Sequence, residues 1–492
     1  MRGTLPRARE ALRSADFSKL FAIRLASQFG DGLFQAALIS SLVFSPEKQN
    51  TTAGFAKATI LVVLPFSVIG PFTGVFIDRW SRRRILVLSP WLRVLFVPLV
   101  LFDPIHAPIA FYAGALLVLS VNRFYLATAQ AVVPRLVPTE DLLIANSLAT
   151  VGGTVALLGG VFAGGQLADA SSSASGATSG FAPVAVAAVL WLIASAIAAR
   201  IRSDLAPHRL PSAALRSELR RIGTEFADGI KRLARAPRAL GPITAITLDQ
   251  MGQGVVLVIS LVVFRQRFRE GVGSFSWLIG AGGVGVFAGL LSVGALESRL
   301  SKERIVAWSF VIGGATLVLV SLAIDRTTVL IASFVVGLTF AWKKVPVDTM
   351  VQEAMPDAYR GRVFAVYDVA YNLSRVIAAL LAIPLLPALG DAGTVAFIGV
   401  LFVAFAPVLP WWISRSPEIE VEFYAGGKAD EVPRAIRWGG VREGVTVEGS
   451  WLEERDGVRY ARVRLALEDG TRLDVARRAD EDRWHLEREM EG

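Results

Sequence analysis

Long apolar runs without a charged side chain constrain the fold of this chain more than any other feature of its sequence. Residues 60–77, 108–121 and 394–413 contain no Lys, Arg, Asp, Glu or His. About 20 residues of α-helix cross a bilayer core of about 30 Å, because each residue adds about 1.5 Å. None of these runs alternates between polar and apolar residues as transmembrane β-strands do. The sequence therefore predicts an all-α membrane protein.

The lengths and spacing of the apolar runs predict about twelve transmembrane helices. We expect them at residues 18–43, 53–77, 84–102, 108–132, 141–168, 181–201, 241–264, 274–298, 303–324, 327–350, 361–386 and 392–414.

The connections between these spans alternate in charge. Lys and Arg cluster in every second connection, at residues 2–19, 79–84, 202–238, 299–304 and 360–362. Because basic residues accumulate on the cytoplasmic side, this pattern predicts a multi-pass protein of the inner membrane with both termini in the cytoplasm. The first 19 residues lack the short apolar core of a signal peptide.

Composition excludes several classes of function. The chain has no cysteine, and His106, His208 and His485 are far apart, so no metal site is expected. The pattern Gly280-Ala-Gly-Gly-Val-Gly285 lies in an apolar span with no preceding strand, which indicates close helix packing rather than nucleotide binding. No nucleophile–base pair and no Walker-type loop is present. We therefore expect neither an enzyme nor a cofactor.

Charge is unevenly distributed along the chain. The net charge is +9, yet residues 417–492 hold 13 Lys/Arg and 19 Asp/Glu, so the remainder is strongly basic. A basic membrane portion is typical of contact with anionic lipid headgroups, and we expect the bilayer rather than nucleic acid as its partner.

Residues 202–240 form the longest connection and divide the chain. Apolar residues recur there every three or four positions between Arg and Lys, which predicts an amphipathic helix at the membrane surface or a solvated linker helix with one packed face. The predicted domains are an N-terminal six-helix bundle (1–201), this cytoplasmic linker (202–240), a C-terminal six-helix bundle (241–415) and a soluble tail (416–492).

The two halves repeat one another. Gln28-Phe-Gly-Asp-Gly32 has a counterpart in Gln250-Met-Gly-Gln-Gly254, 222 residues later. The segment 74–85 matches 294–305, and Arg123 maps onto Lys343, both at a spacing of 220. Such a repeat predicts two pseudo-symmetric bundles with a site between them near the membrane midplane.

The connection between the second and third spans resembles the most diagnostic motif of the major facilitator superfamily, Gly-x-x-x-Asp-Arg-x-Gly-Arg-Arg. Here Ser81 replaces the second glycine, and the resemblance extends over about residues 15–415. It implies a secondary transporter. A carboxylate at a helix end pairs with basic loop residues and with the N-terminus of a neighbouring helix, so we expect a conformational latch. The latch residues are Gly74, Asp78, Arg79, Arg82 and Arg83. A merely positive loop explains the arginines but not Gly74 and Asp78.

Looser patterns are similar to the branch of siderophore exporters and macrolide-efflux carriers. Exporters of this kind carry Gly-Pro-x-x-Gly-Gly in the fifth span. Here the sequence is Gly160-Val161-Phe-Ala-Gly164-Gly165, with Val161 in place of the proline. We expect Gly160, Gly164 and Gly165 to pack against a neighbouring helix.

Ionisable residues inside predicted spans need a partner or a function, because each costs about 2.5–3.5 kcal/mol at the bilayer centre. Asp31 lies near the middle of the first span, where a carboxylate can exchange a proton or hold a static ion pair. Arg123 matches an arginine that the resemblance associates with proton transfer; the alternative is a side chain that snorkels to the interface. Asp368 and Asn372 share a helix face.

We expect proton coupling or a substrate cavity at Asp31, Arg123, Gln253, Lys343, Asp368 and Asn372. For Lys343 and Lys344 the alternative is a position near a helix end, with no role in coupling.

The tail has a different pattern. Val463, Leu465 and Leu467 alternate with charged residues, and Asp469-Gly470 follows, which predicts a β-hairpin in a small cytoplasmic β-rich module. Its core is expected to include three tryptophans: Trp438, Trp451 and Trp484. The module is expected to regulate transport or to bind a cytoplasmic partner.

The sequence thus predicts a monomeric secondary transporter that exports an amphipathic, drug- or siderophore-like molecule in exchange for protons. Its partners are that substrate, protons and the bilayer. The alternatives are an uptake carrier, a lysophospholipid transporter, or a transporter-derived sensor that acts through its tail.

Overall fold

The computed structural model describes most of the helical part of the chain and six segments of the tail. The described residues are 13–44, 80–102, 106–138, 141–175, 181–202, 215–234, 236–355, 357–414, 418–423, 433–438, 441–455, 458–467, 472–478 and 484–490. Eight of the described helices are long and apolar enough to cross a membrane, as expected of a multi-pass membrane protein. The predicted span 53–77 and three latch residues, Gly74, Asp78 and Arg79, lie outside the described residues.

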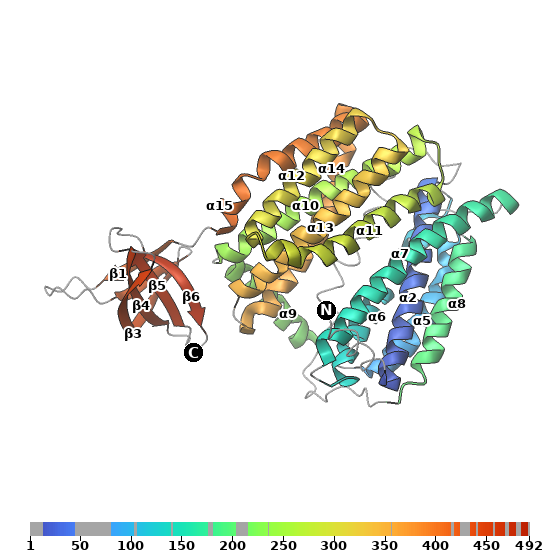
Figure 1. The fold of residues 1–492 in the computed structure, drawn as a ribbon. Coiled ribbons are helices and arrows are strands. Elements are labelled where there is room, and N and C mark those ends of the chain that lie inside the picture. The colour runs from blue at the N-terminus through green and yellow to red at the C-terminus, as the bar shows by residue number, and fades with distance from the viewer. Residues whose placement is uncertain are drawn as a thin grey trace.

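One group of helices comes from the first 200 residues and lies side by side in Figure 1. It comprises α2 (Ala15–Ile39), α5 (Arg82–Val100), α6 (Pro108–Val132), α7 (Leu142–Ser175) and α8 (Phe181–Ala198). A π-helical turn, η1 (Ser40–Phe44), extends α2. In α2, the Ser14 hydroxyl accepts the Phe17 N–H and caps the first turn.

The second group follows α9 (Leu215–Ala234) and forms the other half of the helical part (Figure 1). It comprises α10 (Pro237–Val262), α11 (Val272–Glu297), α12 (Lys302–Leu322), α13 (Arg326–Ala354), α14 (Asp357–Phe405) and α15 (Val408–Ser414). In α14 the backbone leaves helical geometry at Gly390, where φ is 67°, a conformation that glycine adopts without strain. This break falls between two predicted spans, 361–386 and 392–414.

The two groups share a packing pattern. α2 packs against α7 and α8, and α10 packs against α14, which contains the last two predicted spans of its half. Glycines allow backbones to meet at these contacts. A Cβ at Gly160 would lie 2.0 Å from the Phe29 carbonyl oxygen of α2, and one at Gly32 would lie 2.2 Å from the Leu157 oxygen. Gly164 also faces α2, whereas Gly165 faces Val272 and Ser276 of α11, in the other half.

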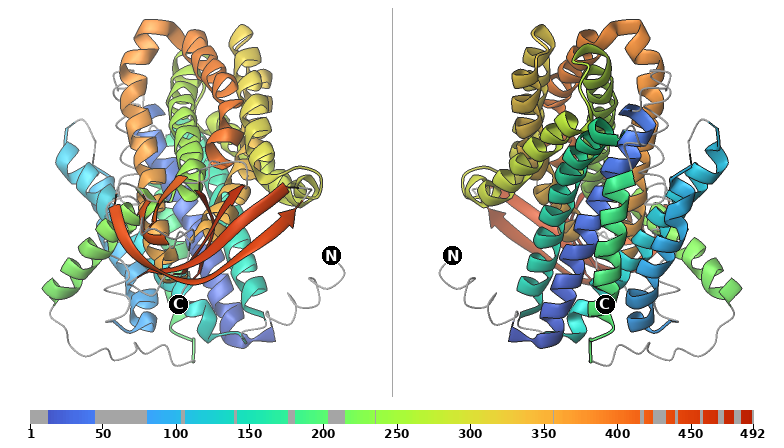
Figure 2. Two further views of the ribbon diagram at one scale, coloured as in Figure 1. Left: turned by 90° about the vertical axis from the view of Figure 1, so that its left-hand side faces the viewer. Right: turned by 90° about the vertical axis from the view of Figure 1, so that its right-hand side faces the viewer.

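α9 has the amphipathic pattern predicted for the linker. Figure 2 shows α9, in green, projecting from the lower flank of the helices. Leu233 and Gly229 are buried, whereas Ile230 and Lys231 are exposed. A Cβ at Gly229 would lie 2.7 Å from the Arg362 oxygen, and the Arg232 guanidinium stacks on the Tyr359 ring. One face of α9 is therefore packed against the start of α14.

The tail forms a closed barrel in which every strand pairs antiparallel with its neighbours and β6 returns to β1. The strands are β1 (Glu418–Phe423), β2 (Pro433–Trp438), β3 (Val441–Arg455), β4 (Val458–Leu467), β5 (Arg472–Arg478) and β6 (Trp484–Met490). β4 and β5 pair as the predicted hairpin, with Val463 opposite Val475. Closure leaves no unpaired sheet edge.

The expected tryptophan core is correct at one position and wrong at another. Trp484 is buried among Ile436, Leu465 and Leu473 in the barrel core. Trp451 is instead exposed on β3, where the Arg464 guanidinium covers its ring, because aliphatic side chains fill the narrow interior. The Trp438 side chain lies outside the described part of the chain.

Candidate functional site

A buried ion pair lies inside the first group of helices. The Arg93 Nη1 of α5 donates to Asp31 Oδ1 of α2 at 2.7 Å, and Arg93 Nη2 donates to Ser27 Oγ at 3.0 Å. The Trp191 indole of α8 donates to the same Asp31 oxygen at 3.0 Å. The Arg93 side chain is 0% exposed and that of Asp31 is 4% exposed. This pair joins three helices within one half.

Two aromatic rings enclose the Arg93 guanidinium. Its Cζ lies 4.7 Å from the ring centre of Tyr125 on α6 and 4.8 Å from that of Trp191. The negative faces of both rings stabilise the cation where no water reaches it. Arg93 therefore holds together four helices, α2, α5, α6 and α8.

The second group contains an equivalent arrangement built from different positions. Lys343 Nζ of α13 donates to Asp249 Oδ1 of α10, and the two side chains are 2% and 0% exposed. Gln253 Nε2 donates to the other Asp249 oxygen at 2.6 Å. The ring centres of Phe310 (α12) and Phe402 (α14) lie 4.8 and 5.5 Å from Lys343 Nζ.

The internal repeat relates the two arrangements. At its spacing of 222 residues, Ser27 corresponds to Asp249 and Asp31 corresponds to Gln253. These two positions are four residues apart. The carboxylate occupies the second of them in the first half (Asp31) and the first of them in the second half (Asp249). Both positions face the same direction, because residues four apart share a helix face. Each half thus places one carboxylate, one cation and two aromatic rings in its interior.

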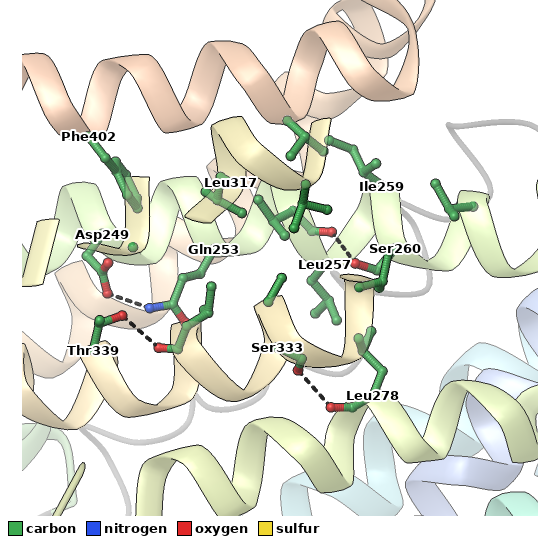
Figure 3. Close-up of a pocket in the computed structure, with 18 of the residues that line it drawn as sticks. Asp249, Gln253, Leu257, Ile259, Ser260, Leu278, Leu317, Ser333, Thr339 and Phe402 are labelled. Atoms are coloured by element: carbon green, nitrogen blue, oxygen red, sulfur yellow. Dashed lines mark hydrogen bonds between the residues drawn. The ribbon is translucent and has the colours of Figure 1, made fainter. Parts of the chain in front are cut away.

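A cavity of about 200 Å³ opens beside the second ion pair (Figure 3). Asp249 and Gln253 lie at one end of it (Figure 3), and Lys343 and Arg375 of α14 also line it. The remaining wall is mainly aliphatic, and α10, α11, α12, α13 and α14 all contribute to it. The cavity therefore lies within one half of the molecule, not between the halves.

A second set of charged groups lies where the halves face one another. Arg123 Nη2 of α6 and Asp368 Oδ2 of α14 are 4.0 Å apart, and their side chains are 28% and 67% exposed. Lys344 Nζ donates to both oxygens of Asp348 at 2.6 Å, and the Tyr367 hydroxyl donates to Asp348 Oδ1 at 2.9 Å. Unlike the two buried pairs, the four charged side chains of this set are partly exposed, whereas Tyr367 is buried.

The family model described as Major Facilitator Superfamily matches residues 20–379 and 243–452. The chain belongs to the Major Facilitator Superfamily (MFS). It is therefore a membrane transporter and not an enzyme. An uncharacterised MFS-type transporter of Mycobacterium tuberculosis is 28% identical over 392 residues, which are 78% of this chain and 88% of that protein. An uncharacterised MFS-type transporter of Mycobacterium bovis matches to the same extent.

Solved structures of other transporters share the fold. A POT family transporter bound to a thioalcohol-conjugated peptide has a TM-score of 0.66 and 14% identity over 81% of this chain and 96% of its own. The nucleoside transporter NupG has a TM-score of 0.62 and 11% identity, over 81% and 98%. At this level of identity the likeness concerns the fold alone.

The MFS fold brings some of the predicted coupling residues together and separates others. Arg123 meets Asp368 between the halves, whereas Asp31 lies within one half and Gln253 and Lys343 within the other. The Asn372 side chain donates to the Asp368 carbonyl oxygen at 2.8 Å. Lys343 lies well inside α13 and not near a helix end, and its ammonium pairs with Asp249.

Sequence reasoning missed Arg93, the cation partner of Asp31. The available signal was an arginine well inside the predicted span 84–102, nine positions after the arginine cluster that ends at Arg84. Asp348 and Asp169 were also missed. Both stand near the predicted ends of spans, where a charged residue needs no buried partner.

The two halves of this MFS protein are joined where α7 ends and α11 begins. Asp169 Oδ2 of α7 accepts the Gly273 N–H of α11 at 2.9 Å, and the Asp169 carboxylate also accepts the Val272 N–H. Gln166 Nε2 donates to the Gly273 carbonyl oxygen at 2.8 Å, and Phe162 packs edge-on against Trp277 at 4.7 Å. A carboxylate from one half therefore caps a helix of the other half.

We expect Asp169→Asn to weaken this contact by about 1–2 kcal/mol, which corresponds to a shift of about 5–30-fold towards the state in which α7 and α11 separate. The chain has no cysteine, so spin labels attach specifically at Ala170→Cys and Gln266→Cys, and pulsed electron resonance reports the distance between them.

Asp325→Asn is the matched control, because the Asp325 carboxylate caps α13 within a single half. It is expected to leave the labelled distance unchanged. A distance distribution that Asp169→Asn leaves identical to that of the parent would contradict the assigned contact.

Proposed function

We propose that this MFS transporter exports an amphipathic small molecule in exchange for protons, by alternating access of a cavity between its two halves. It lies in the inner membrane with twelve spans and both termini in the cytoplasm. The observation that carries the coupling is the ion pair between Arg123 of one half and Asp368 of the other.

The position of this pair suits a proton-dependent contact. The Asp368 carboxylate is largely accessible, so a proton from the cavity reaches it directly. Protonation of Asp368 removes the negative charge that attracts the Arg123 guanidinium. Because the pair spans the halves, losing it changes the relative free energies of the two access states.

Aromatic and charged side chains beside this pair provide a surface for an amphipathic substrate. Lys344 Nζ lies 4.9 and 5.7 Å from the ring centres of Tyr367 and Tyr371, and Asp348 holds Lys344 in place. Rings of this kind accept apolar bodies as well as cations. Tyr367 is buried and holds Asp348 from inside the bundle, whereas Tyr371 is partly exposed. Lys344 and Tyr371 therefore support binding without requiring one substrate shape.

The contact between α7 and α11 supports an inward-open state. In the proposed orientation α7 ends and α11 begins on the outer side, where Asp169 holds the halves together. At the opposite ends, Arg83 of the proposed latch donates to the Ala199 carbonyl oxygen at the end of α8. This contact lies within the first half. In the outward-open state, Arg82 and Arg83 act with Gly74, Asp78 and Arg79 as the latch.

The test is proton movement in vesicles that contain the purified protein and a pH-sensitive dye, during addition of a panel of amphipathic compounds. The parent protein is expected to show a proton flux that depends on the added compound. Asp368→Asn is expected to reduce that flux at least about tenfold, within the range of typical coupling free energies. Glu353→Gln is the control, because Glu353 forms an exposed pair with Lys302 away from the cavity.

Compound-dependent flux that persists in Asp368→Asn would contradict the role of Asp368. Compound movement without any proton flux in the parent protein would contradict exchange and favour an uptake carrier or a lysophospholipid transporter.

A further inference from the structure

We propose that the cavity inside the second half of the molecule binds an amphiphile with one anionic head group, carboxylate or phosphate, and a single alkyl chain. The head group binds to Arg375, and the chain fills the aliphatic part of the cavity shown in Figure 3. This site is separate from the cavity between the halves, and its occupancy requires no proton gradient.

The charges around Arg375 do not balance without an anion. Asp249 pairs with Lys343, Asp368 with Arg123, and Asp348 with Lys344. Each of these three carboxylates therefore has its own cation. In the part of the chain that the structure describes, Arg375 has neither an ion pair nor a side-chain hydrogen bond, although it lines the cavity.

Arg375 is only partly buried, but a guanidinium that lines a cavity inside a membrane span is favoured by an anionic partner. Arg24 shows how this chain satisfies an arginine that has no carboxylate. Its Nε donates to Gln28 Oε1 at 3.1 Å and its Nη1 to Gln130 Oε1 at 2.7 Å. Arg375 has no such amide partner among the described residues. Its forked donors match the paired oxygens of a carboxylate or phosphate.

The rest of the cavity fits an alkyl chain. Beyond Asp249 and Gln253, the wall continues over Val256, Leu257, Leu317, Val329 and Val336, which come from three helices, α10, α12 and α13. Ser260 and Ser333 also face this region, but their hydroxyls donate to the carbonyl oxygens of Val256 and Leu278. These hydroxyl protons are therefore not available to a ligand. A ligand that places charge at one end and methylenes along this wall satisfies both parts of the cavity.

A glycine next to Arg375 fixes the position of the Arg375 backbone. A Cβ at Gly254 of α10 would lie 2.6 Å from Ala378 Cβ and 3.4 Å from Arg375 Cα. α10 and α14 therefore approach closely at this level, so the Arg375 side chain starts from a rigid helix contact. A site built on two packed helices is pre-organised for binding.

The test uses the full chain in nanodiscs of neutral phosphatidylcholine, with radiolabelled decanoate as the probe and empty nanodiscs as the background. The parent protein is expected to bind decanoate saturably. Arg375→Gln is expected to weaken binding at least about tenfold, and Arg375→Lys is expected to retain part of it. Arg304→Gln, on the exposed cytoplasmic turn of α12, is the matched control and leaves binding unchanged.

Competitors identify the chemistry. Decyl phosphate that displaces decanoate supports an anion site open to lipid phosphates, whereas displacement by fatty acids alone supports the same site with a carboxylate ligand. Displacement by decanol or decyltrimethylammonium as effective as that by decanoate would overturn the proposal.

A second variant keeps the proposal testable if Arg375→Gln fails to fold. Ala332→Leu fills the aliphatic part of the cavity and keeps Arg375, so it is expected to weaken decanoate binding more than acetate binding. Unchanged decanoate binding in both Arg375→Gln and Ala332→Leu would also overturn the proposal. Because binding is measured without transport, failure here leaves the proposed export untouched.

Discussion

Replacing Arg93 by Met is expected to lower the free energy of unfolding by about 3–5 kcal/mol, the typical cost of removing one member of a buried ion pair. The change leaves the Asp31 carboxylate inside the bundle with the Trp191 indole as its remaining strong donor. It also removes the cation that both Tyr125 and Trp191 face. Titration with sodium dodecyl sulfate in mixed micelles, followed by circular dichroism, measures the difference.

Two further variants separate the ion pair from general damage. Arg84→Met is the matched control, because Arg84 is exposed on the same helix, and it is expected to change stability by less than about 0.5 kcal/mol. The double variant Arg93→Met with Asp31→Leu is expected to regain most of the lost stability, since it removes both charges together. A double variant less stable than Arg93→Met alone would contradict this account.

The same double variant decides the role of Asp31 in transport. If the proposed coupling depends on Arg123 and Asp368 alone, the stable double variant keeps its proton flux. Asp31 is then a structural residue that holds α2 against α5. Loss of flux from a stable double variant would instead place Asp31 in the coupling path.

The sequence predicted the helical part well because the bilayer sets a length and a composition that each span must satisfy. Gly390 illustrates the limit of this reasoning. Two apolar runs predict two spans, and the two helices of α14 meet directly at a kink at Gly390. The length of a connection depends on how the helices turn, which hydropathy does not record.

The partners of buried charges were harder to predict. Asp31 was identified because a carboxylate in an apolar run is costly. Its partner Arg93 lies on another helix, and the choice of helix depends on packing. The repeat also misled here, because it pairs Arg123 with Lys343, although Arg123 lies between the halves and Lys343 lies within one. Equivalent positions in a repeat need not have equivalent neighbours.

The second large effect is expected at Lys343, in the other half. Lys343→Met leaves Asp249 at 0% exposure with only glutamine donors, so we expect the free energy of unfolding to fall by about 3–5 kcal/mol. The chain supplies its own control in the next residue. Lys344→Met removes a cation from a pair that is 30% exposed and local to one helix, and it is expected to cost less than about 1 kcal/mol.

Comparing these two lysines tests whether burial, not charge, determines the effect. Both are cations on α13, both have one carboxylate partner, and both face aromatic rings. If the loss of stability at Lys343 is as small as the loss at Lys344, the interior of the second half is hydrated enough to solvate Asp249. The Asp249–Lys343 pair is then not structural. A large loss at Lys343 but not at Lys344, together with a large loss at Arg93, means that each half is held together by its own buried pair. The halves then move as rigid bodies, and only the exposed pair between them responds to protons.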